Sequence, residues 1–120
     1  MSIATDVASL QIMAHVYKKM SIQSIFEKTC DSLVSEVPYI DWVGILLFEE
    51  GNSKLVAASD FENDLQWESN GELKFPISNS MGQQIGMMIV RSREAIAFDV
   101  TDVSTLETIA EAIGQESFAN

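Results

Sequence analysis

Residues 75–92 read F-P-I-S-N-S-M-G-Q-Q-I-G-M-M-I-V-R-S, two apolar runs joined by a short polar segment. The joining segment contains the asparagine, serine and glycine that tight turns favour. Apolar runs on both sides of such a turn are typical of two antiparallel strands. Residues 72–78 and 84–92 are therefore predicted to form a β-hairpin.

A second pair of strands is predicted earlier in the chain. Residues 42–48, W-V-G-I-L-L-F, are continuously apolar, which is typical of a strand near the middle of a sheet with both faces covered. After the turn E-E-G-N-S, the weaker run K-L-V-A-A-S at residues 54–59 is expected to return nearer an edge. Residues 60–70 are charged and lack a clean period, so we expect a loop there.

Three helices are expected around these strands, at residues 3–20, 22–37 and 102–114. The second helix is amphipathic and ends at Pro38, and its start is expected at Ser21 or at Ser24, which would form a capping box with Glu27. The start of the third helix is left open between Asp99 and Ser104, because several side chains there could cap it. Gly114 suits its end.

The first helix is apolar around most of its circumference. One stripe contains Val7, Leu10, Ala14 and Tyr17, and a second stripe contains Ala8, Ile12, Met13 and Val16. Such a helix needs cover on two sides, and a small domain supplies only one. The other side is a candidate homodimer interface. The candidate interface residues are Val7, Leu10, Ala14, Tyr17, Leu106 and Ile113.

Composition restricts the classes of function. The chain has 120 residues, the size of one domain, and 18 acidic against 7 basic residues give a formal charge of -11. This charge disfavours binding to nucleic acids and anionic lipids. No apolar run approaches the roughly 18 residues of a membrane span. Cys30 is the only cysteine and His15 the only histidine, so we expect a reducing, cytoplasmic location and no metal or cofactor.

The predicted elements together resemble the core of the GAF domain family. The resemblance runs from Ile22 to Ile113 and rests on the strand pair at residues 42–59, the proline-marked strand L-K-F-P-I, the strand I-G-M-M-I-V-R-S, and Phe98 before the last helix. It implies an α+β fold with a mostly antiparallel central sheet and with the N- and C-terminal helices packed on one face. It also implies a signalling or regulatory module that senses a small molecule or binds a partner protein.

In GAF domains the opposite sheet face usually carries longer loops and helices that enclose a small-molecule pocket. Only residues 60–70 occupy that place here, too few to enclose a cavity of roughly 300 Å³. We therefore expect Phe61, Leu65 and Trp67 to fold onto this face and fill most of the space. The candidate pocket lining is Val43, Ile45, Phe61, Trp67, Phe75 and Met87.

Catalysis is not expected. Some GAF proteins are free methionine sulfoxide reductases, which use cysteines in the pocket loops, whereas Cys30 is predicted on the buried face of the second helix, where a thiol is inert. His15 is interpreted as structural. Asp60, Glu62 and Asp64 fail as a calcium loop because the glycine and glutamate required further on are absent. The leading hypothesis is a non-catalytic, homodimeric regulatory module; the alternatives are an interaction-only module with a filled pocket and, less favoured, a reductase-like enzyme.

Overall fold

The computed structural model describes residues 2–18 and 21–117. Four antiparallel strands form one sheet: β1 (Trp42–Glu49), β2 (Asn52–Ala58), β3 (Gly71–Ser78) and β4 (Gln84–Ser92). Their order across the sheet is β2-β1-β4-β3. The two most apolar strands, β1 and β4, are therefore central, because a central strand is the one covered on both faces.

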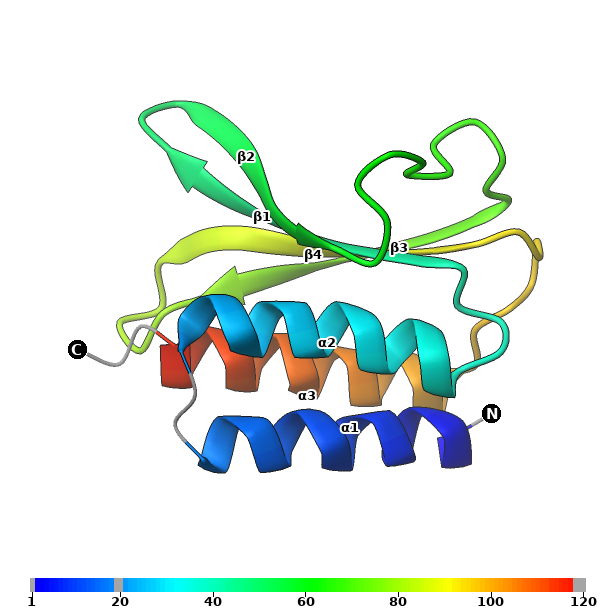
Figure 1. Cartoon of the computed structure of the whole chain (residues 1–120), viewed down its shortest axis with the longest axis horizontal. Coiled ribbons are helices and arrows are strands. Elements are labelled where there is room, and N and C mark those ends of the chain that lie inside the picture. The colour runs from blue at the N-terminus through cyan, green and yellow to red at the C-terminus, as the bar shows by residue number, and fades with distance from the viewer. Residues whose placement is uncertain (1, 19–20, 118–120) are drawn as a thin grey trace.

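Three helices, α1 (Ser2–Tyr17), α2 (Ile22–Glu36) and α3 (Val100–Ser117), all lie on one face of the sheet (Figure 1). This confirms the α+β fold with helices on a single face. α2 and α3 lie against the sheet, and α1 packs beneath them as an outer layer. None of the described helices is both long and apolar enough to cross a membrane.

The helix starts are set by side-chain caps. Ser21, rather than Ser24, caps α2 by accepting a hydrogen bond from the backbone N–H of Ser24 (3.2 Å). Asp99 caps α3: its carboxylate accepts from the N–H of Asp102 (2.8 Å), and the Asp102 carboxylate accepts from the N–H of Asp99 (3.2 Å). This reciprocal pair is a capping box built from two aspartates. α3 therefore begins at Val100, within the range from Asp99 to Ser104 that the sequence left open.

Gly114 does not end α3, contrary to the sequence-based expectation, because the helix continues to Ser117. Its role is close packing. A side chain at Gly114 would clash with the backbone carbonyl of Ser78 at the end of β3. The glycine therefore lets the last turns of α3 approach the sheet.

The main core lies between the sheet and the helices. Alternate residues of a strand point to opposite faces, so Val43 and Ile45 of β1 and Phe75 of β3 are buried in this core. Trp42 and Leu46 instead belong to a second, smaller cluster. We call the sheet face that bears this second cluster, on the side away from the helices, the open face.

Asp102 of α3 joins α1 and the turn that follows α2. It is fully buried, and its carboxylate accepts hydrogen bonds from Thr5 Oγ1 of α1 (3.1 Å) and from the Tyr39 hydroxyl (2.7 Å). Burial acts to raise the pKa of Asp102, but the hydrogen bonds from Tyr39, Asp99 and Thr5 outweigh it and hold the pKa below its ordinary value of 3.8. The ionised form is therefore the one that stabilises the fold.

Asp102→Asn should change how stability depends on pH. The folded-state pKa is lowered, so the stabilisation by ionised Asp102 is complete above 3.8 and is lost as pH falls through the lower folded value. Urea unfolding at pH 7 and at steps from pH 5 to 2 measures this. The stability gap between wild type and variant should be constant above about pH 5 and narrow below about pH 4. A gap that stays constant down to pH 2 would contradict this role.

Candidate functional site

The family resemblance implies a ligand pocket on the open face of the sheet. The strand register places three rows of residues across the central strands: Trp42, Arg91 and Glu72; Gly44, Ile89 and Lys74; and Leu46, Met87 and Pro76. The first row is polar and aromatic and the other two are mainly apolar. The open face is thus built from the centre of β1 and β4.

Trp42 occupies the middle of this face. A side chain at Gly44 would clash with the six-membered ring of Trp42, so the indole lies directly over this glycine. Trp42 is 2 % exposed, and its indole N–H donates to the backbone carbonyl of Asp60 (2.8 Å). The strand therefore uses a glycine to make room for a tryptophan that lies flat on the sheet.

Arg91 packs against the indole of Trp42. Its guanidinium carbon lies 4.8 Å from the centre of the Trp42 ring, a cation–π contact. Its Nε donates to Glu72 Oε2 (2.7 Å) and its Nη1 donates to the backbone carbonyl of Asp64 (2.7 Å). Arg91 is buried, and these contacts join β1, β3 and the segment above them.

That segment is residues 59–70, which we call the β2–β3 loop; it stands on the open-face side (Figure 1). Leu65 is its buried apolar residue, 4 % exposed, and it packs with Trp42 and Ile89. Leu65 has a positive φ of 57°, a conformation uncommon for a residue with a side chain. Leu65 is therefore the loop residue that covers Trp42 and Ile89 on the open face.

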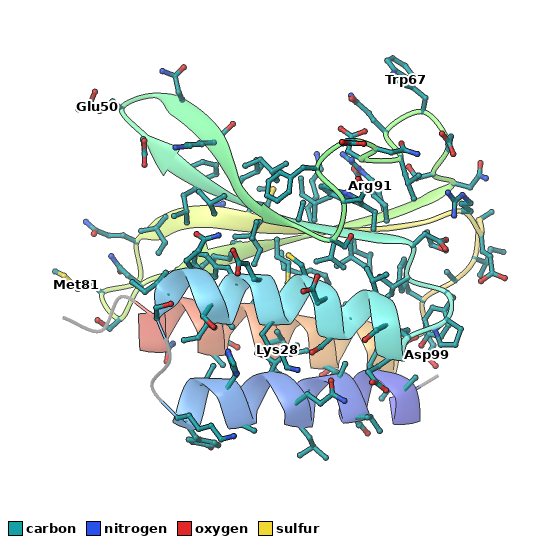
Figure 2. The ribbon with its side chains drawn as sticks, viewed as in Figure 1. Lys28, Glu50, Trp67, Met81, Arg91 and Asp99 are labelled. Atoms are coloured by element: carbon teal, nitrogen blue, oxygen red, sulfur yellow. The ribbon has the colours of Figure 1, made fainter. Side chains whose placement is uncertain are left out.

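The expectation that Phe61 and Trp67 would also cover this face is wrong. Phe61 is 63 % exposed and Trp67 is 91 % exposed. Figure 2 shows Trp67 at the far end of the loop, directed away from the sheet. The reason is that Trp42, supplied by the sheet itself, already fills the space.

The six candidate pocket residues are not brought together. Val43, Ile45 and Phe75 lie in the main core beneath the sheet, while Met87 lies beside the second cluster on the open face. Phe61 and Trp67 extend into solvent. Residues in three different environments cannot line one cavity, so the predicted pocket does not exist in this form.

The prediction missed Trp42 and Arg91, which fill the open face, and Gly44, which makes room for the indole. Their two-residue spacing along the strands was the signal that could have found them.

The candidate interface residues also divide into two groups. Val7, Leu10, Ala14 and Tyr17 form an exposed stripe on the outer side of α1, and the second stripe, with Ala8, Ile12 and Val16, is buried. Leu106 and Ile113 of α3 are fully buried in the main core, so their assignment to an interface is wrong. Of the six candidate interface residues, only the four on α1 are exposed to a partner.

Reactive groups are sparse among the described residues. Cys30 is buried on α2, and burial together with the nearby Asp31 and Glu27 charges raises the pKa of its thiol well above the ordinary value. His15 Nε2 lies 2.8 Å from Ser24 Oγ, linking α1 to α2. No three His, Cys, Asp or Glu side chains within the described ranges gather as a metal-binding group.

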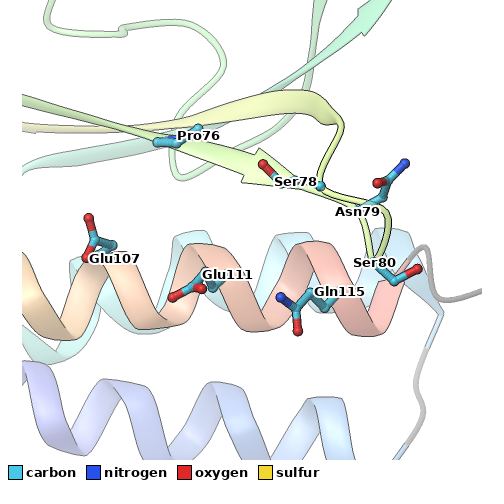
Figure 3. A pocket seen from close by; sticks show the side chains of 8 residues that line it. Pro76, Ser78, Asn79, Ser80, Glu107, Glu111 and Gln115 are labelled. Atoms are coloured by element: carbon cyan, nitrogen blue, oxygen red, sulfur yellow. The ribbon is translucent and has the colours of Figure 1, made fainter.

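Three clefts lined by described residues lie at the margins of the fold. The one shown in Figure 3 has a volume of about 430 Å³ and lies between α3 and the end of β3. It is lined by Pro76, Ser78, Asn79, Ser80, Gly82, Glu107, Glu111 and Gln115. The lining is polar and acidic and has none of the aromatic enclosure of a typical small-molecule site.

Comparison with solved structures identifies the architecture. A putative GAF sensor protein from Burkholderia vietnamiensis superposes with a TM-score of 0.82 at 13% identity, covering 95% of this chain and 93% of that one. The GAF domain of a phosphoenolpyruvate-protein phosphotransferase from Coxiella burnetii gives 0.79 at 13% identity, with 94% and 92% covered. A type II free methionine-R-sulfoxide reductase from Thermoplasma acidophilum gives 0.67 at 21% identity, with 78% and 89% covered.

No protein-family model and no curated protein sequence matches the chain. The structural likeness, at 13–21% identity in these three cases, is a likeness of fold. It includes both sensor-type domains and an enzyme, and it agrees with the motifs at residues 42–59 and 72–92. The chain has the GAF fold.

Proposed function

We propose that this chain is a non-catalytic regulatory module that acts as a homodimer through protein contacts and does not enclose a small molecule. The observation that carries the proposal is Trp42 lying over Gly44 at the centre of the open face. Enclosed ligand sites commonly need roughly 300–1,000 Å³. Trp42, Arg91 and Leu65 take up the space that such a site would use. The interaction-only reading is therefore favoured over small-molecule sensing.

A reductase function is less well supported. The chemistry implied by the family resemblance needs cysteines in the loops around the open face, and the β2–β3 loop has none. The single thiol, Cys30, is buried on α2 on the other side of the sheet. A buried thiol with a raised pKa carries little of the reactive thiolate.

We propose that a second copy of the chain covers the exposed stripe of α1, which consists of Val7, Leu10, Ala14 and Tyr17. Between Val7 and Tyr17 the only ionisable side chain is His15, in a chain of net charge -11. Two copies that meet on this stripe therefore avoid most of the like-charge repulsion that other surfaces would impose. If the two α1 helices pair antiparallel, with the two-fold axis midway between Leu10 and Ala14, then Leu10 of one copy lies beside the small Ala14 of the other.

Leu10→Asp should convert the dimer into a monomer. Leu10 is 72 % exposed, so the substitution should spare the fold while placing two like charges near the two-fold axis. Sedimentation velocity at micromolar concentrations measures the mass directly. Ile96→Asp is the matched control, because Ile96 is an even more exposed apolar residue, at 96 %, and lies outside α1. It should remain a dimer. A monomeric wild-type protein, or a dimeric Leu10→Asp variant, would overturn the proposed assembly.

A further inference from the structure

The β2–β3 loop presents two aromatic side chains to solvent, with Trp67 the more exposed (Figure 2). Aromatic residues, tryptophan above all, are enriched among the residues that dominate protein interfaces, and each buries about 150–250 Å² when covered. In the folded chain most of the Trp67 surface stays in water. The packing of the fold therefore does not account for a tryptophan at this position.

The loop holds this arrangement through its own hydrogen bonds. Asp60 Oδ1 accepts from the N–H of Glu62 (2.9 Å), and Asp64 Oδ1 accepts from the N–H of Gln66 (2.9 Å). Arg91 fixes the middle of the loop through the Asp64 carbonyl, and Leu65 is buried beside it. A loop fixed in this way loses little conformational entropy when a partner binds.

The charge around the aromatic residues is negative. The loop contains Asp60, Glu62, Asp64 and Glu68 and no basic residue. The two arginines beside it are already paired: Arg91 is buried against Glu72, and Arg93 lies within 3.7 Å of both Asp41 and Glu68. This field repels a second copy of the chain, nucleic acid and anionic lipid, and attracts a positively charged protein segment.

We propose that the β2–β3 loop is a docking surface for a basic segment of a partner protein. Trp67 is the anchor, and the Glu62 carboxylate together with the net negative charge of the loop supplies the charge complementarity. A guanidinium can stack on the exposed indole as Arg91 does on Trp42 within the same protein. This inference rests on the proposed function, action through protein contacts, and names the surface and the chemistry of the partner.

The test uses two synthetic peptides and the whole chain. The probe is acetyl-Arg-Leu-Arg-Ile-Arg-Leu-Arg amide, which has no aromatic residue, and its counterpart carries Glu in place of each Arg. Binding is followed by tryptophan fluorescence and by calorimetry for wild type, Trp67→Ala and Ile96→Ala. Ile96→Ala is the matched control, since Ile96 is as exposed as Trp67 but lies outside the loop. Sedimentation of each sample reports the dimer separately.

The basic peptide should bind wild type and Ile96→Ala alike, shift the tryptophan emission to the blue, and bind Trp67→Ala at least about 10-fold more weakly, as expected for an interface anchor. The acidic peptide should not bind. Absence of binding, equal binding to Trp67→Ala, or a Trp67-dependent dimer would overturn the docking surface. A monomer that still binds the basic peptide through Trp67 would refute the proposed dimer and leave this inference standing.

Discussion

Trp42→Ala is expected to lower the free energy of unfolding by about 3–5 kcal/mol, the usual cost of removing a buried large aromatic side chain. The indole is 2 % exposed and packs over Gly44, against Arg91 and under the β2–β3 loop. Its removal would leave an empty space at the centre of the open face and release the hydrogen bond to the Asp60 carbonyl. Urea unfolding followed by circular dichroism measures the loss.

Trp42→Phe is the graded control. It keeps an aromatic ring over Gly44 but cannot donate to Asp60, so it should cost clearly less than the alanine variant. A Trp42→Ala variant within about 1 kcal/mol of wild type would mean that the open face does not depend on the indole.

Leu65→Ala is expected to cost about 2–5 kcal/mol, whereas Trp67→Ala should stay within about 0.5 kcal/mol of wild type. The larger residue has the smaller effect because only Leu65 is buried, at 4 % exposure, while Trp67 is 91 % exposed. Both residues lie in one loop and the same unfolding experiment compares them. Equal losses for the two variants would show that the loop packs differently, with Trp67 against the sheet.

The fold could be predicted because its signals are periodic and local. The continuous apolar run of β1, the turn between β3 and β4 and the amphipathic α2 each depend on residues close in the chain. The order of the layers depends on distant residues. α1 has two apolar stripes, and nothing within residues 2–17 says which one packs on α2 and α3.

The open face could not be predicted in the same way. Its loop offers Phe61, Leu65 and Trp67, and hydrophobicity alone favours burying the aromatic residues. The choice of Leu65 depends on a positive φ at that residue and on Arg91 holding the adjacent carbonyl. The Arg91 hydrogen bond joins β4 to the loop across 27 residues of sequence, so local patterns do not reveal it.

The alternation of β1 carried more information than the prediction used. In a continuously apolar strand the composition does not show which set of alternate residues faces the helices, and Val43 and Ile45 were assigned to the face that Trp42 and Leu46 occupy. A glycine two residues after a tryptophan, on the same face of a strand, indicates a ring lying flat on the sheet. The structure shows that this shared face is the open face.

The two indole N–H groups test the filled open face most directly. In a ¹⁵N-labelled sample the Trp42 indole, buried and bonded to the Asp60 carbonyl, should exchange its proton slowly with solvent, and the Trp67 indole should exchange rapidly. Addition of cyclic AMP, cyclic GMP or free methionine sulfoxide at millimolar concentration should leave the Trp42 signal unmoved. Rapid exchange at Trp42, or a shift of its signal with any of these small molecules, would contradict the claim that the chain fills this face with its own side chains.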